Sequence, residues 1–137
     1  KYPVLLNNYD SKDCSILELQ SDSIHRINFT KNDKYLRRFI INESSIIIED
    51  EFRLNKSSLF ELSIQLSEKV NFKFLNNKIK ILFNKSNLTL SSNTEIKNIV
   101  SSTYSESYNK LKNNSTLNFE KEIKNKFKNV IKIELST

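Results

Sequence analysis

Alternation of apolar and polar residues is the feature that most narrows what this chain can fold into. Along residues 59–66 the even positions are all apolar, whereas Glu61, Ser63 and Gln65 are polar. A strand points successive side chains to opposite faces, so this period of two predicts a strand with one packed face and one solvated face.

The same period recurs in the segments that follow. Residues 70–74, 79–83 and 88–90 also alternate, and with residues 59–66 they predict a four-stranded antiparallel meander. Other strand candidates are residues 15–19, 24–30, 35–41, 46–52, 95–101, 103–108, 115–119 and 129–135. Among them, Ile46, Ile47 and Ile48 form a β-branched run that is typical of a strand covered on both faces.

The chain has no glycine and a single proline, so other residues must make its turns. Asn accepts positive φ more easily than most residues, and Asn76-Asn77 is placed to close a two-residue hairpin. The lack of glycine also excludes the glycine-rich loops that bind phosphates and dinucleotides. Many short strands separated by polar turns predict a single all-β domain over residues 1–137, an antiparallel β-sandwich of two packed sheets.

One segment near the C-terminus has a different period. Phe119, Ile123 and Phe127 are spaced four residues apart, with Glu and Lys between them, and this spacing is typical of a helix. The sequence therefore does not decide whether residues 120–128 form strand or a single short helical turn.

Composition limits the partners that the chain could have. Its 137 residues include 22 Lys and Arg against 16 Asp and Glu, which gives a net charge of +6. The lysines are scattered among Asn and Glu, so the pattern favours a solvated surface over a nucleic-acid-binding patch. No apolar run approaches the roughly 20 residues that a membrane helix needs, and the start does not resemble a signal peptide. A chain without methionine is expected to be a segment excised from a longer protein.

The sequence offers few groups for catalysis or metal binding. His25, the only histidine, shares a strand face with Ile27 and Phe29. It could act as an acid or base, but a half-buried structural role is favoured because no nucleophile motif accompanies it. A zinc site needs three or four nitrogen or sulfur ligands, which His25 and Cys14 cannot supply. We therefore expect no metal and no cofactor, and the lone Cys14 excludes a disulfide framework within the chain.

The acidic residues Glu49, Asp50 and Glu51 follow the isoleucine run. Paired carboxylates can hydrolyse glycosidic bonds or bind calcium, but adjacent residues of a strand point to opposite faces. Glu49 and Asp50 therefore cannot both face one substrate. The cluster is predicted to be a solvated guard at the end of a strand.

Four residues are candidates for binding carbohydrate. Arg37 and Arg38 should point to opposite faces of a strand, and either could pair with a carboxylate or sulfate. Tyr104 and Tyr108 are four residues apart, so on a strand they would share a face and could stack on sugar rings. The alternative is that both tyrosines pack inward and both arginines only solvate the surface.

Several segments of the sequence resemble the heparinase II/III-like family. Residues 37–52, RRFIINESSIIIEDEF, are similar to a basic strand, a turn and an aliphatic strand ending Asp-Glu in that family's C-terminal domains. Residues 60–66 look like its alternating strand, and residues 104–109, YSESYN, look like its Tyr-Ser-Pro-x-Phe-Gly motif. Residues 4–13 resemble the stretch that follows the family's His-Asn-Thr motif. These segments occur in the same order and at similar spacing.

The resemblance implies a parent protein with a helical toroid followed by β-sandwich layers. Active members of the family are bacterial polysaccharide lyases that cleave uronic-acid-containing chains by β-elimination. Where the family's basic strand opens with His, this chain has Leu36, and no catalytic residue of the family is carried over to it. We therefore expect a non-catalytic C-terminal β-sandwich whose partners are an acidic polysaccharide and the helical domain of the same parent chain.

Two other interpretations stay open. One is a non-catalytic carbohydrate-binding or structural module of bacterial surface-polysaccharide metabolism. The other is an adhesin-type or nucleic-acid-binding domain that shares only the β pattern. The sequence does not indicate the compartment or the particular polysaccharide.

Overall fold

The computed structural model describes residues 4–21, 23–24, 27–28, 33–68 and 70–136. Every regular element in this part of the chain is a β-strand, so the predicted all-β class is confirmed. The strands are β1 (Val4–Asp10), β2 (Cys14–Ser21), β3 (Ser23–Ile24), β4 (Ile27–Asn28), β5 (Lys34–Asn42), β6 (Ser45–Arg53), β7 (Ser58–Leu66), β8 (Asn71–Leu75), β9 (Lys78–Phe83), β10 (Ser86–Ser92), β11 (Ile96–Ser107), β12 (Lys110–Ile123) and β13 (Lys126–Ser136).

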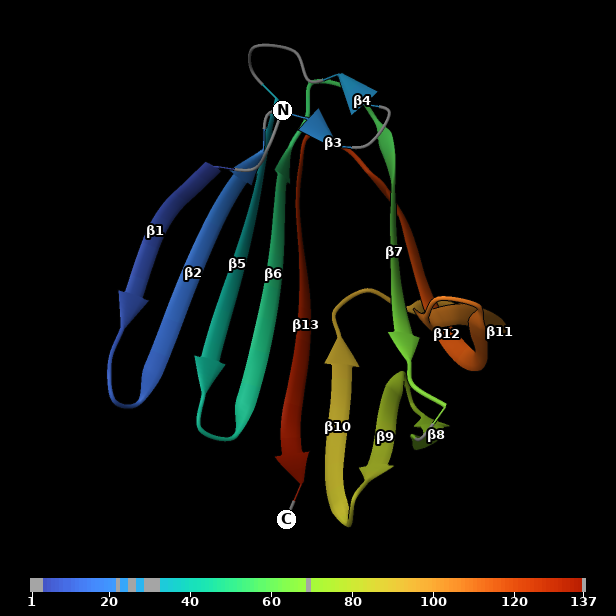
Figure 1. Ribbon diagram of the computed structural model, residues 1–137. Coiled ribbons are helices and arrows are strands. Elements are labelled where there is room, and N and C mark those ends of the chain that lie inside the picture. Colours follow the sequence, from blue (N-terminus) through green and yellow to red (C-terminus); the bar gives the residue numbers. More distant parts are fainter. Residues whose placement is uncertain (1–3, 22, 25–26, 29–32, 69, 137) are drawn as a thin grey trace.

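The strands form two main sheets of unequal size. The larger sheet has eight strands in the order β1-β2-β5-β6-β13-β10-β9-β8, and the smaller has three in the order β11-β12-β7. β3 and β4 form a separate two-stranded pair, and every pairing is antiparallel. Figure 1 shows the smaller sheet facing one side of the larger one, which confirms the predicted sandwich.

The hydrophobic core lies between the two sheets. One cluster joins Leu117 and Phe119 of β12 to Ile79 and Ile131 of the larger sheet, and all four are at most 1% exposed. A second cluster has the buried residues Phe52, Phe60 and Ile123. We call the side of the larger sheet that faces the smaller one its inner face, and the opposite side its outer face.

The predicted alternation of residues 59–66 is confirmed in β7. Phe60 and Leu66 are buried, while Glu61, Ser63 and Gln65 are exposed. The alternation of residues 70–74 also predicts a packed side chain for Phe74, which is wrong because this side chain is 48% exposed. Phe74 lies on β8, an edge strand, where neighbouring structure covers side chains on fewer sides.

The predicted four-stranded meander is wrong in one respect. β8, β9 and β10 are antiparallel neighbours as expected, but β7 pairs with β12 in the other sheet. The alternation showed which face of each strand is apolar, whereas the choice of neighbour depends on where the chain crosses between sheets. The two-residue turn is as predicted, since Asn76 and Asn77 both have positive φ, at 50° and 57°.

The suggested helical turn is also wrong. β12 continues to Ile123, and β13 begins at Lys126 after a turn in which Asn125 has a φ of 58°. Phe119 and Ile123 share a strand face because four residues is an even number of steps. Phe127 then packs against the cluster containing Ile123 from the next strand. A spacing of four fits a strand face as well as a helix face.

The strand boundaries and the coverage of the isoleucine run also differ from expectation. Residues 95–101 and 103–108, expected as two strands, belong to the single strand β11, and β1 was not among the strand candidates. The isoleucine run is not fully covered, because Ile46 is 40% exposed. Of residues 24–30, only 24 and 27–28 are described, and these lie in β3 and β4.

Candidate functional site

The two candidate arginines lie at successive positions in the middle of β5. Arg37 pairs in register with Asp50 of β6, and Arg38 pairs with Glu49. Arg37 is on the inner face, since its neighbours in register include the buried Asp50, and Arg38 is on the outer face. Strand alternation therefore separates the two guanidinium groups by the thickness of the sheet.

On the inner face, Arg37 belongs to a compact polar cluster around Asp50. Arg37 Nε and Nη2 donate hydrogen bonds to Asp50 Oδ1 and Oδ2 at 2.6 and 3.0 Å. The Tyr35 hydroxyl also donates to Asp50 Oδ1, at 2.6 Å. The Asp50 side chain is 0% exposed, so a buried carboxylate is held by one bidentate arginine and one phenol.

The electrostatics of this cluster follow from its burial. Burial raises the pKa of the Tyr35 hydroxyl well above its usual range, and the nearby negative charge of Asp50 raises it further. The hydrogen bond that Arg37 donates to Asp50 raises the pKa of the guanidinium. Tyr35 therefore stays neutral and Arg37 stays charged at any physiological pH, and neither is suited to transferring protons.

A second buried polar residue lies beside the cluster. Asn129 of β13 is the register partner of Asp50 and is 0% exposed. Its Oδ1 accepts a hydrogen bond from Thr94 Oγ1 at 2.7 Å, whereas its Nδ2 has no partner among the described residues. The inner face thus carries a polar layer between the two apolar clusters of the core.

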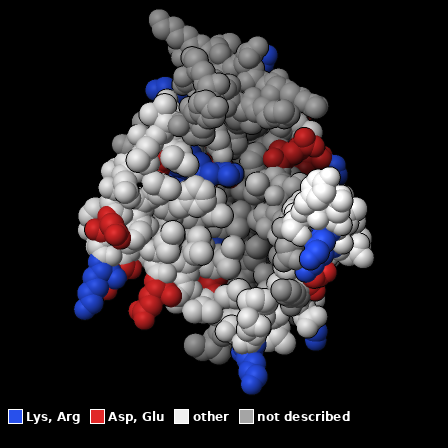
Figure 2. Space-filling model, in the orientation of Figure 1, with Lys and Arg blue, Asp and Glu red and all other residues white. Residues whose placement is uncertain are grey.

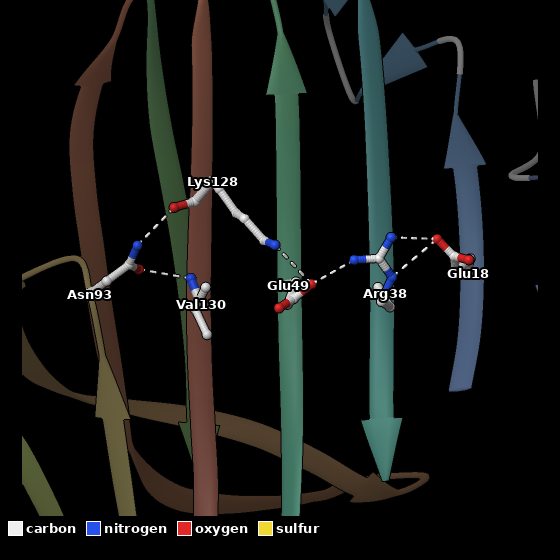
Figure 3. Close-up of polar contacts among 6 residues, drawn as sticks. All are labelled: Glu18, Arg38, Glu49, Asn93, Lys128 and Val130. Carbon is white, nitrogen blue, oxygen red and sulfur yellow. Dashed lines mark hydrogen bonds and ion pairs between the residues drawn. The ribbon is translucent and has the colours of Figure 1, made fainter. Parts of the chain in front are cut away.

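On the outer face, Arg38 is the centre of an ion-pair chain across four strands (Figure 3). Its Nε and Nη2 donate to Glu18 Oε2 of β2 at 3.1 and 2.7 Å, and its Nη1 donates to Glu49 Oε2 of β6 at 2.8 Å. Lys128 Nζ of β13 lies 3.2 Å from the same Glu49 oxygen. The hydrogen bond from Arg38 lowers the pKa of Glu18, and the bond to Glu18 raises the pKa of Arg38.

The ion-pair chain is anchored to β10 through the backbone of β13. Asn93, which follows β10, donates from Nδ2 to the Lys128 carbonyl at 2.8 Å and accepts from the Val130 N–H at 2.7 Å (Figure 3). The acidic residues Glu49 and Asp50 are therefore not a solvated guard at a strand end. They lie within β6, an interior strand, where each neutralises an arginine.

The candidate tyrosines belong to the other sheet. Tyr108 lies in the turn after β11 and is 92% exposed, and Asn109 in the same turn has a φ of 57°. The backbone of Tyr104 pairs with Lys112, but its side chain is outside the described part of the structure. An irregularity between Ser105 and Ser107 interrupts the alternation on which a shared face depended.

The structure does not bring the four candidates together. Figure 1 shows β5 and the β11–β12 hairpin on opposite sides of the molecule, and the two arginines point to opposite faces of one sheet. His25 lies outside the described residues. Among the residues that are described, no group of three His, Cys, Asp or Glu side chains could hold a metal ion, and no helix is long and apolar enough to cross a membrane.

Sequence reasoning missed the ion pairs of Arg37 and Arg38. Each arginine and its partner on β6 are separated from the turn at Glu43-Ser44 by the same number of residues. Predicting a hairpin with its turn at these two residues would therefore have predicted both pairs. It also missed a row of polar side chains on the smaller sheet, in which Ser63 donates to Asn118 and Asn118 donates to Asn98, each at 2.8 Å. These residues line a shallow hollow of about 350 Å³.

The surface charges are mixed. Figure 2 shows basic and acidic side chains interspersed over one face, and the described residues of this face form no single large patch of either sign. On the visible face, this distribution agrees with the solvated surface expected from the scattered lysines.

Comparison with known proteins establishes the family. The model of the family described as "Heparinase II/III-like, C-terminal" matches residues 29–134. The chain belongs to the heparinase II/III-like family. The match confirms the resemblance seen in the sequence. The matched residues include β5 to β12 and nearly all of β13.

Solved structures show the same fold in longer chains. The heparan sulfate lyase HepC from Pedobacter heparinus is similar with a TM-score of 0.80 and 20% identity, over 97% of this chain and 21% of that one. A structure of heparinase III gives 0.76 and 14%, over 97% and 21%. The Slr1438 protein from Synechocystis gives 0.64 and 9%, over 98% and 66%. A search of curated proteins finds no match.

The chain is much shorter than the heparinase structures that it matches. The chain spans about a fifth of the length of the heparinase structures, and it matches them almost from end to end. It therefore corresponds to one part of such proteins, a C-terminal β-sandwich.

Proposed function

We propose that this chain is the C-terminal β-sandwich of a longer protein that cleaves acidic polysaccharide by β-elimination. The observation that carries the proposal is the family match over residues 29–134, which is supported by the fold shared with a heparan sulfate lyase. In this proposal the parent's helical domain provides the catalytic base, and the sandwich shapes one side of the polysaccharide cleft. The substrate class is a uronic-acid-containing chain.

The sandwich by itself is proposed to be non-catalytic. β-Elimination needs a base for the proton beside the uronate carboxylate and a group that stabilises the resulting charge. Arg37 and Arg38 are each paired with a carboxylate, and Tyr35 has a raised pKa and a buried partner. These groups stabilise the fold, so they are poorly placed for the chemical step.

The experiment compares the full-length protein with residues 1–137 alone. Each is incubated with heparan sulfate, alginate or hyaluronan, and the ultraviolet absorbance of the unsaturated uronate product is followed. We expect product from the full-length protein and none from residues 1–137. Product from the short chain would contradict the non-catalytic role, and no product from a folded full-length protein on any substrate would contradict the lyase activity.

A second candidate function is binding of carbohydrate without chemistry, and the exposure of Tyr108 favours it. A 92% exposed aromatic ring at a hairpin turn is available to stack on a sugar, with Tyr104 proposed to contribute from β11. Arg37 and Arg38 are less suitable than the sequence suggested, because binding would have to compete with their ion pairs. Tyr108→Ala should weaken binding of an acidic oligosaccharide without unfolding the protein, whereas Tyr9→Ala, on another exposed tyrosine, should not.

A further inference from the structure

The two sheets of the sandwich cover each other incompletely. The larger sheet has eight strands and the smaller only three. Several apolar side chains on the inner face of the larger sheet remain exposed, although inner-face residues elsewhere form the core. They include Ile41 (47%), Ile46 (40%) and Leu135 (51%), together with Leu5 (54%), Phe74 (48%) and Phe83 (39%) nearer the two edges of the sheet. Ile41 and Ile46 are register partners on β5 and β6, so the exposed apolar surface is continuous across these strands.

The free edge of β7 is unlike the other sheet edges. β1 has a bulge between Leu5 and Asn7, β8 is only five residues long, and β11 has two register irregularities. Such features protect an edge from pairing with another strand. β7 has nine residues, continuous register with β12 and a single charged side chain, Glu61. It is therefore the one described edge of the two main sheets that is built to accept a neighbour.

The position of β7 connects these two observations. β7 is the edge of the smaller sheet that lies nearer to β6 and β5 in Figure 1, with β12 and β11 beyond it. A strand added beside β7 would extend the smaller sheet over the inner face of β6 and β5. Its side chains on that side would cover Ile41 and Ile46.

We propose that β7 pairs with an additional strand of the same polypeptide, from outside residues 1–137, and that this strand covers the inner face of β5 and β6. The inference rests on the proposed function in one respect, that the chain is one domain of a longer protein. The solved heparinase structures are about five times as long as this chain, so they contain polypeptide that could supply such a strand. The added segment would alternate apolar and polar residues, as β7 itself does.

A second copy of the chain is a poorer occupant of this edge. Pairing two β7 strands antiparallel requires a two-fold axis perpendicular to the smaller sheet. Both large sheets would then lie on the same side of the joined sheet. Because β5 and β2 extend beyond β7 on that side, the two large sheets would collide.

Hydrogen exchange of the full-length protein tests the pairing directly. Every second amide of β7 points away from β12, and these amides should exchange at least about 100-fold more slowly than the outward-pointing amides of the edge strand β8. Rapid exchange at alternate β7 positions, similar to that of β8, would overturn the proposal. Protection that disappears on dilution, together with a dimer in light scattering, would assign the edge to a second copy and would also overturn it.

A matched pair of variants tests the covered face. Ile41 and Leu82 are both 47% exposed in this chain, but Ile41 is on the inner face and Leu82 on the outer face. In the full-length protein, Ile41→Asp should lower Tm by roughly 5–10 °C because the new charge would be buried, and Leu82→Asp should change it by less than about 2 °C. Equal shifts would contradict the proposal. Neither measurement uses polysaccharide, so an inactive protein with a protected β7 would refute the lyase activity alone.

Discussion

Arg37 and Arg38 are neighbours in the chain, yet they belong to two very different environments. Arg37 faces the interior and holds Asp50, a carboxylate that is 0% exposed and also accepts a hydrogen bond from Tyr35. Arg38 faces outward and pairs with Glu18 and Glu49, whose side chains are 17% and 16% exposed. Both residues are arginines, so replacing them should change the free energy of unfolding by different amounts only because their carboxylate partners differ in burial.

A buried carboxylate without its partner is costly, because the charge is neither hydrated nor paired. A carboxylate near the surface can turn to water instead, so its ion pair contributes little. The cluster around Asp50 is therefore a structural requirement of this sandwich, whereas the ion-pair chain centred on Arg38 adds little to its stability.

The largest effect is expected from Arg37→Leu. This change leaves the buried Asp50 carboxyl without its charged partner, and should lower the free energy of unfolding by about 3–5 kcal/mol. Urea denaturation at neutral pH measures the loss. The added change Asp50→Asn should recover a substantial part of this loss. An Arg37→Leu variant as stable as Arg38→Ala would show that the ion pairs of Arg37 and Arg38 contribute equally to stability.

Tyr35→Phe should have the next largest effect. It removes one hydrogen bond to the buried Asp50 carboxylate but keeps the ring that stacks on Phe52 at 4.7 Å between centroids. The expected loss is about 1.5–3 kcal/mol, the range for hydrogen bonds to charged groups. Tyr9→Phe, at a residue 55% exposed, is the matched control and should change stability by less than about 0.5 kcal/mol. A loss at Tyr35 no larger than that at Tyr9 would mean that Asp50 does not need the phenol.

Arg38→Ala should cost only about 0.2–1 kcal/mol, because its partners remain partly hydrated. The loss should shrink further in about 1 M NaCl, where the Debye length falls to roughly 3 Å. The same salt should leave the loss from Arg37→Leu nearly unchanged. A cost above about 2 kcal/mol that does not respond to salt would place Arg38 in the same class as Arg37.

The smallest expected effect is a pH dependence of the stability that the ion-pair chain centred on Arg38 contributes. Arg38 lowers the pKa of Glu18 in the folded protein, so this pair stabilises the fold above the unfolded pKa of Glu, about 4.3. The contribution is lost as the pH falls through the lower folded pKa. The difference in urea midpoint between wild type and Arg38→Ala should therefore be present at neutral pH and vanish in acid. A difference that grows on acidification would contradict this assignment.

Much of the fold could be predicted because strand alternation is a local property. The faces of β7, the strands β8 to β10 and the Asn76-Asn77 turn all follow from residues close in sequence. Alternation also correctly implied that Arg37 and Arg38 point to opposite faces. The error at residues 120–128 arose because a spacing of four residues satisfies a helix and a strand equally.

The candidate site was less predictable. Its residues come from different strands, and only tertiary pairing decides their partners. Asp50 looked like part of a solvated acidic cluster, yet it is buried because β6 is an interior strand and Asp50 is on the inner face, toward the smaller sheet. Tyr104 and Tyr108 looked like a shared platform, yet a register irregularity separates them and the sheet that carries them is not the sheet of the arginines.

The all-β class, the inward face of most strands and the family resemblance could all be predicted from the sequence, because each depends on residue type and local spacing. The tertiary structure was needed to show that β7 leaves the meander for the smaller sheet, that β6 is an interior strand, and that the carboxylate held by Arg37 is fully buried while those held by Arg38 are partly exposed. The physical reason is that alternation fixes the direction of a side chain relative to its own strand. The burial of that side chain depends on what a second sheet, far away in sequence, places above it.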